Sequence, residues 1–239
     1  MAAADRIARL SAEERWMADA RAVAAPAGGY MVREVEMTRA AAWVEALRAS
    51  GAPGALHHLV VRAAALALAR NPAVHQIVCG YERLVPAAVD VGLAMSESSP
   101  APVVIEGASE RALPALIEVV DAAIAAGPSE ARSFAGLRWF GWLAPFGFLR
   151  RLWLRWLQGR FWFRRRMAGT FQVTFAPAAD MVVPMRFLTG STLGVGRVRE
   201  VVAPVDGRLQ VRRVMTMTLA ADHVAMDGVR MATLLNDIA

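Results

Sequence analysis

The feature that most constrains the fold is a long run of strand-like sequence near the end of the chain. Residues 191–223 are rich in Val, Thr, Leu and Met, and Asp206-Gly207 divides the run into two halves. An Asp-Gly pair between two such halves is a strong hairpin signal, because both residues tolerate the positive φ of a tight turn. The chain is therefore expected to build an extended sheet around this hairpin.

The rest of the chain alternates helix-like and strand-like segments. The periodicity predicts further strands at 30–37, 75–85, 87–96, 103–107 and 171–177. It predicts helices at 5–24, 38–50, 55–72, 109–127 and 229–238. With no internal repeat or low-complexity linker, we expect one α/β domain over residues 1–239, an α+β sandwich with a mixed β-sheet covered by helices. Residues 137–166 stand out within it as a Trp/Arg-rich amphipathic insertion.

The charged residues exclude several kinds of chemistry. All 27 basic residues are arginine, so a lysine Schiff base, a P-loop lysine and a lipoyl group on this chain are excluded. Residues 131–179 hold nine arginines and no acid, whereas the rest of the chain holds 18 arginines against 21 acids. The positive charge thus belongs to one segment, and we expect no nucleic-acid partner.

Compartment and metal content follow from a few residue types. Cys79 is the single cysteine, which excludes an internal disulfide or a cysteine metal cluster. No apolar run is long enough to span a bilayer, and the first residues lack the apolar stretch of a secretory signal. A cytoplasmic location is expected. The adjacent His57 and His58 are expected to point to different faces of a helix as core or subunit-contact residues, and no metal site is predicted.

The sequence ADHVAMDG (221–228) holds the strongest candidate for chemistry. His223 follows the strand-like run and precedes the closing helix, with Asp227 and Gly228 shortly after it. A neutral imidazole can act as a general base when it is oriented and paired with a group that stabilises charge. From these residues alone, a base and a structural histidine remain equal alternatives.

An ordered set of motifs resembles the catalytic domain of the dihydrolipoamide acyltransferases, the E2 components of 2-oxoacid dehydrogenase complexes, which share a fold with chloramphenicol acetyltransferase. The stretch 222–228 resembles the family's D-H-R-x-x-D-G, and GTFQVT (169–174) resembles its G-T-F-x-[IV]-[ST]. Three earlier segments, REVEMTRAAAWVEAL, ALHHLVVRAAALALARNPAVHQ and VDVGLAMSESSPAPVVIEGAS, are similar to family segments in the same order.

This resemblance implies a function and a site. His223 would be the general base, the Thr174 hydroxyl would stabilise the tetrahedral oxyanion, and Asp227 would hold the local structure. The chain would be an acyltransferase that moves an acyl group between coenzyme A and a thiol, hydroxyl or amine acceptor, with acyl-CoA as co-substrate. It would form a homotrimer with active sites between subunits, and the acceptor could be a small molecule, a carrier protein or a lipid-like compound.

Several residues depart from the family pattern. Val224 replaces the family arginine after the histidine, and Phe175-Ala176-Pro177-Ala178 replaces its SNLG. No lipoyl or subunit-binding segment is recognised before the catalytic part, and the tail after Asn236 is short for a cage-forming core. The departures leave a second hypothesis open: a catalytically silent homologue that acts in assembly or partner binding.

The Trp/Arg-rich insertion allows two interpretations. Leu149, Leu152, Trp153, Trp156 and Leu157 recur at helical spacing, and the arginines at 150, 151 and 155 lie off that stripe. The segment is either an in-plane membrane helix or lipid-binding mouth, or an amphipathic helix packed on the sheet or on a neighbouring subunit. The first interpretation adds peripheral membrane contact through 137–166 to the expected cytoplasmic location.

Overall fold

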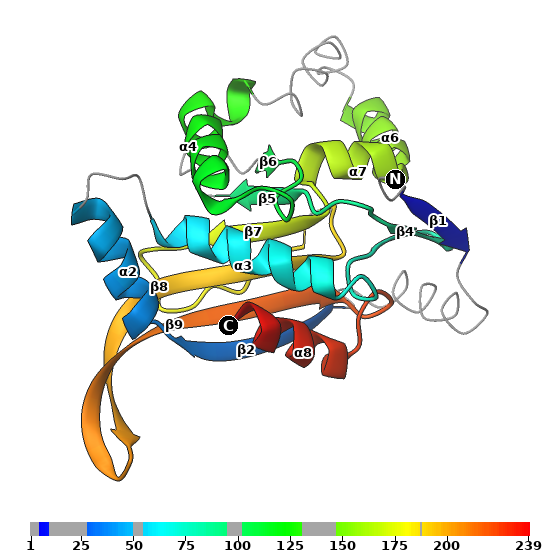
Figure 1. Cartoon of the computed structure of the whole chain (residues 1–239). Coiled ribbons are helices and arrows are strands. Elements are labelled where there is room, and N and C mark those ends of the chain that lie inside the picture. The colour runs from blue at the N-terminus through cyan, green and yellow to red at the C-terminus, as the bar shows by residue number, and fades with distance from the viewer. Residues whose placement is uncertain (1–4, 10–27, 50–54, 95–101, 131–146, 187) are drawn as a thin grey trace.

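The computed structural model describes residues 5–9, 28–49, 55–94, 102–130, 147–186 and 188–239. Its main element is the predicted hairpin, formed by β8 (Ser191–Val205) and β9 (Arg208–Asp222). Asp206 and Gly207 join the strands with φ values of 50° and 76°, which confirms the expected turn. The far half of the hairpin extends beyond the rest of the molecule (Figure 1).

The hairpin lies within a mixed six-stranded sheet of order β2-β9-β8-β7-β5-β6. The other strands are β2 (Gly28–Glu36), β5 (Val91–Ala94), β6 (Val103–Ile105) and β7 (Phe171–Phe175). Strand β7 pairs in parallel with both β5 and β8, whereas β9 is antiparallel to β8 and β2. Strand β7, which carries Thr174 near its end, therefore lies inside the sheet between β5 and β8.

Helices cover one face of this sheet: α2 (Thr38–Ala49), α3 (Leu56–Arg70), α4 (Leu113–Glu130) and α8 (Gly228–Ile238) (Figure 1). The main core lies between helices and sheet and includes Leu68, Phe171, Val173, Leu193 and Leu219. The expected mixed sheet covered by helices is therefore confirmed.

A second, smaller sheet corrects one prediction. Residues 5–24 are predicted to be helical, but β1 (Arg6–Arg9) is a strand that pairs antiparallel with β4 (Glu82–Val85), and β4 pairs with β3 (Ile77–Cys79). The partner strand supplies hydrogen bonds that the periodicity of an isolated segment does not reveal. Residues 10–24 lie outside the described residues.

The described part of the Trp/Arg-rich insertion forms two helices, α6 (Gly147–Gln158) and α7 (Phe161–Ala168). Leu157, Phe163 and Met167 form a small separate core between them, with Trp153 and Leu188 packed against it. Residues 137–146 lie outside the described residues. None of the described helices is both long enough and apolar enough to cross a membrane.

Candidate active site

The turn that carries His223 is built on the buried carboxylate of Asp222. Its Oδ1 accepts a hydrogen bond from Val224 N at 3.0 Å, and its carbonyl oxygen accepts from the backbone of Ala225 and Met226 at 2.9 Å. Its Oδ2 lies 3.2 Å from Nη1 of Arg186. Asp222 thus fixes the backbone that follows His223.

Arg186 reaches Asp222 because the neighbouring strand position has no side chain. Gly28 of β2 pairs with Asp222, and a Cβ at Gly28 would lie 3.3 Å from Arg186 Nε. A larger residue at Gly28 would push the guanidinium away from the carboxylate. The arginine lies outside the sequence motif, so the motif predicts the turn but not this ion pair.

His223 and Val224 are adjacent in the turn but differ in exposure. The His223 side chain is exposed, whereas Val224 is buried against Val78 of β3 and Ala225. Val224 therefore belongs to the core, and the imidazole is available to a ligand or to another chain.

Asp227 begins helix α8. Its Oδ1 accepts a hydrogen bond from Arg230 N at 2.8 Å, and its Oδ2 lies 3.6 Å from Nε of Arg230. This is the arrangement of an N-cap, in which a side-chain oxygen satisfies an amide of the first helical turn. The contact accords with the structural role predicted for Asp227, because it fixes where α8 starts after His223.

The motif GTFQVT combines a structural anchor with the candidate oxyanion residue. Gly169 has a φ of 73°, and a Cβ there would lie 2.5 Å from the Asp90 carbonyl oxygen, so only glycine fits. Thr170 is buried; its hydroxyl donates to Asp90 O at 3.1 Å and accepts from Asp90 N at 2.9 Å. Together these residues fix the start of β7 against β5.

Thr174 lies on the face of the sheet opposite to the main core. Side chains alternate along a strand, and Phe171 and Val173 belong to the core, so Thr174 points to the other face. Its neighbour on β8 is Gly194, where a Cβ would lie 2.6 Å from the Val182 carbonyl oxygen. The segment that follows β7 therefore crosses this face directly beside the partly buried Thr174.

Within one chain, the strand register keeps Thr174 and His223 apart. Thr174 pairs with Gly194, which pairs with Thr218, and His223 follows Thr218 by five residues. Five residues correspond to about 17 Å along the strand, and two strand spacings add about 10 Å across the sheet. The structure thus does not bring these two predicted residues together in a single chain.

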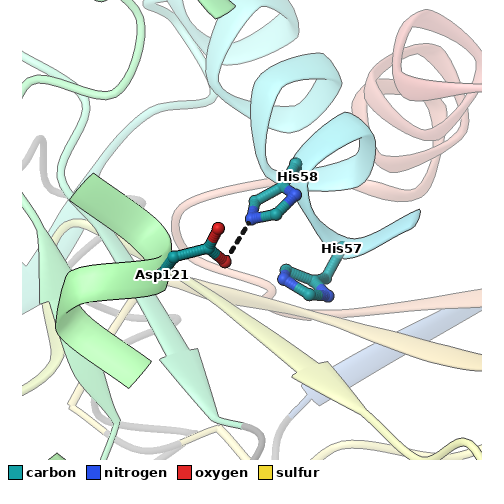
Figure 2. Close-up of side chains that lie close together, drawn as sticks. All are labelled: His57, His58 and Asp121. Carbon is teal, nitrogen blue, oxygen red and sulfur yellow. Dashed lines mark hydrogen bonds and ion pairs between the residues drawn. The ribbon is translucent and has the colours of Figure 1, made fainter. Parts of the chain in front are cut away.

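The adjacent histidines correct another expectation. His57 and His58 lie in the first turn of α3, and instead of diverging, their ring centroids lie 4.1 Å apart, with the rings tilted by 54°, beside Asp121 of α4 (Figure 2). His58 Nδ1 accepts a hydrogen bond from Ala55 N at 3.1 Å, so its Nε2 carries the proton and donates to Asp121 Oδ1 at 2.9 Å. Both nitrogens of His58 are in use, and metal binding would break one of these hydrogen bonds.

His57 differs from its neighbour. It is half-buried, its ring makes an edge contact with Phe175 at 6.1 Å, and Nε2 has no hydrogen-bond partner among the described residues. Burial first, and then the adjacent His58, lower its pKa to about 4. A neutral ring at this position suits packing against the end of β7.

The sequence patterns do not predict a set of polar contacts around the buried residues His75, Thr170 and Asp90. His75 Nε2 donates to the Thr170 hydroxyl at 2.7 Å, and Arg165 of α7 donates to Asp90 Oδ2 at 2.6 Å. These residues are far apart in the sequence, and no local motif connects them. They link α7, β5 and β7, and so support the strand that carries Thr174.

Comparison with known proteins agrees with this arrangement. Residues 189–239 match the model of the 2-oxoacid dehydrogenases acyltransferase (catalytic domain) family. The matched segment holds the hairpin, the His223 turn and α8. No curated protein matches the chain.

Solved structures share the fold over nearly the whole chain. The probable dihydrolipoamide acetyltransferase from Listeria monocytogenes 4b F2365 has a TM-score of 0.68 and 17% identity, over 93% of this chain and 86% of that one. The Azotobacter vinelandii dihydrolipoamide acetyltransferase (E2p), investigated for the role of a serine, a histidine and an asparagine in catalysis, has a TM-score of 0.67 and 15% identity, over 88% and 79%.

A chloramphenicol acetyltransferase is similar with a TM-score of 0.58 and 12% identity, over 95% of this chain and 94% of that one. The predicted resemblance is confirmed by the two kinds of comparison together. The chain has the fold shared by the E2 acyltransferase catalytic cores and chloramphenicol acetyltransferase, and its segment 189–239 matches the 2-oxoacid dehydrogenase acyltransferase family.

Proposed function

We propose that this protein is an acyltransferase that moves an acyl group between coenzyme A and a thiol, hydroxyl or amine acceptor. The observation that carries the proposal is the exposed His223 on a turn fixed by Asp222 and Asp227, inside the segment that matches the acyltransferase family. Acyl-CoA is the co-substrate, and no lipoyl group takes part on this chain because it has no lysine.

The proposed residues correspond to chemistry investigated in a similar protein. In the Azotobacter vinelandii enzyme, the asparagine stands four residues after the histidine, as Asp227 stands after His223 here. In the proposed reaction, Thr174 takes the part of the serine, because it also carries a hydroxyl. The change from asparagine to Asp227 preserves an oxygen that can cap α8.

The reaction needs one proton carrier and one hydrogen-bond donor. The His223 imidazole accepts the proton of the acceptor as its sulfur, oxygen or nitrogen attacks the thioester carbonyl carbon. The Thr174 hydroxyl donates to the resulting oxyanion. The carbon–sulfur bond to coenzyme A then breaks, and the imidazolium gives its proton to the leaving sulfur, so the enzyme returns to its starting state without a covalent intermediate.

The proposed active unit is a homotrimer with each site between two chains. The separation of Thr174 and His223 along the strand register supports this, because a single chain leaves the two groups of the reaction too far apart. His223 of one chain would meet Thr174 of its neighbour.

Release of free thiol from a panel of acyl-CoAs, in the presence of candidate acceptors, tests the proposal. His223→Gln removes the base but keeps a polar side chain, and should lower kcat/KM by roughly 10²–10⁴-fold. His75→Gln makes the same change in a buried histidine that the reaction does not use, and should retain activity when the protein is folded.

Equal thiol release by the wild type and His223→Gln would instead favour a catalytically silent homologue that acts in assembly. The replacement of the family arginine by the buried Val224 is the observation that keeps this second function in view.

A further inference from the structure

Helix α6 presents apolar side chains to solvent. Phe148, Leu152 and Trp156 recur every fourth residue, so they form a row along one face, and Leu149 lies beside them. Their exposed fractions are 70%, 65% and 54%, with 38% for Leu149. Another side of helix α6, which includes Leu157, is buried in the small core between α6 and α7. The row is therefore exposed although the helix is packed.

The charged residues of the segment that holds this row, 131–179, are all arginines. Arg155 follows Leu152 by one turn, and Arg160 lies with its guanidinium 4.6 Å from the centre of the Trp156 ring. Neither arginine forms an ion pair with any residue that the structure describes. Trp162 and Arg166 are exposed and lie one turn apart on α7. The sequence offers no acid between residues 131 and 179.

We propose that α6 binds the surface of an anionic phospholipid bilayer, lying in the plane of the membrane with Phe148, Leu152 and Trp156 among the lipid chains. Twelve residues make a helix of about 18 Å, which is too short to cross but sufficient to lie in the interface. Arginines beside the apolar row would contact lipid phosphates, and tryptophan favours this depth of a membrane.

Charge distinguishes this partner from a second copy of the chain. A symmetric contact between two α6 faces would bring Arg155 and Arg160 close to the same arginines of the other copy. An acidic lipid surface supplies the opposite charge over the whole area, and about fivefold in affinity is expected from each such arginine.

Helix α7, which packs against α6, is linked to the His223 turn through β3. Arg164 of α7 donates from Nη1 to the Val78 carbonyl oxygen at 3.2 Å, and the Val78 side chain packs against Val224. Strand β3 therefore contacts both α7 and the turn that carries His223. This position suits an acyl donor or acceptor that resides in a membrane.

Flotation with vesicles of phosphatidylcholine, with and without phosphatidylglycerol, tests the inference on the full chain. The wild type should float with the anionic vesicles and remain largely unbound to phosphatidylcholine alone. Leu152→Glu should weaken binding by about tenfold or more, since a charge replaces an apolar side chain that lies among the lipid chains in the bound state. Arg155→Gln should weaken binding about fivefold.

Leu209→Glu is the matched control, because Leu209 is 77% exposed at the far end of the β8–β9 hairpin. It should float like the wild type, and circular dichroism should show that all variants are folded. Wild type left at the bottom with anionic vesicles, or equal losses in Leu152→Glu and Leu209→Glu, would overturn the inference. A lower solution mass for Leu152→Glu alone would also overturn it, by identifying the face as a contact between copies. None of these results depends on acyl transfer, so the membrane proposal and the proposed acyltransferase function are tested independently of each other.

Discussion

The two threonines of the GTFQVT motif show how residues of one type, four positions apart, acquire different roles. Thr170 is buried and its hydroxyl bonds to both backbone groups of Asp90, whereas Thr174 is partly buried on the face of the sheet opposite to the main core. A hydroxyl already committed to the backbone cannot stabilise a developing charge. Thr174 is therefore the candidate for chemistry and Thr170 the anchor of its strand.

Replacing Thr174 by valine should lower kcat/KM by roughly 10²–10³-fold, because valine keeps the shape but removes the oxyanion donor. Thr174→Ser keeps the hydroxyl and should stay within about tenfold of wild type. Thr233→Val, at an exposed threonine of α8, is the control for the same chemical change. Acyl-CoA thiol release measures all three, and an active Thr174→Val would remove Thr174 from the site.

His75 should make the protein less stable in acid. Burial lowers the pKa of His75 to about 4, from an ordinary value of 6.5. Below about pH 6.5 the unfolded chain binds a proton at His75, whereas the folded chain binds it only below about pH 4. The contribution of His75 to stability is therefore complete above this pH range and decreases as the pH falls through it. Lowering the pH from about 7 to about 5 should therefore decrease the free energy of unfolding by about 2 kcal/mol through His75 alone.

Urea unfolding of wild type and His75→Gln at the two pH values measures this contribution. The amide of glutamine can still donate to the Thr170 hydroxyl but does not titrate, so the loss of stability between the two pH values should shrink by about 2 kcal/mol. The same pH dependence in both proteins would show that the acid sensitivity arises elsewhere, for example at His57, whose pKa is lowered in the same direction.

Among the elements, α8 and the preceding turn form the unit that aims His223. Asp222 holds the start of the turn and Asp227 its end, and both act through backbone amides. The orientation of the imidazole is thus a property of the turn and helix rather than of a direct side-chain partner.

Removal of the α8 cap gives a test at this scale. Asp227→Ala should lower the free energy of unfolding by about 1 kcal/mol, because the Arg230 amide loses its acceptor. Asp227→Asn keeps an oxygen in the same place and should cost less than about half of that. Thermal and urea melts measure the two variants; equal losses would contradict capping as the source of the stability.

At the scale of the whole molecule, the sheet register separates the two residues of the proposed reaction within one chain. The pairing of Thr174, Gly194 and Thr218 places His223 beyond the reach of Thr174 in its own chain. A cyclic trimer in which each chain contacts the next through different surfaces can bring the two residues together three times.

Mixed trimers test this arrangement. Chains with His223→Gln and chains with Thr174→Val should each be nearly inactive alone. When they are co-expressed in equal amounts, about one interface in four should combine an intact His223 with an intact Thr174 and restore about a quarter of wild-type activity. No recovery in mixtures confirmed by mass to be trimers would place each site within one chain.

The local sequence determined the elements whose signals are local. Asp206-Gly207 set the hairpin, Asn71-Pro72 ended α3, and the spacing of 222–228 identified the turn and the capped helix. The same local signals failed at residues 6–9, where pairing with β4 outweighs helical periodicity, and at His57 and His58, which both turn toward Asp121.

Only the tertiary structure decided which distant residues support the site. Arg186 reaches Asp222 across Gly28, His75 reaches Thr170, and Val78 joins the His223 turn to α7, and each contact unites segments with no common sequence pattern. It also decided that Thr174 and His223 lie apart, because strand register depends on which strands pair and not on the spacing of two motifs along the chain. The sequence by itself predicted the candidate chemical groups, His223 and Thr174, whereas the fold determined the separation between them.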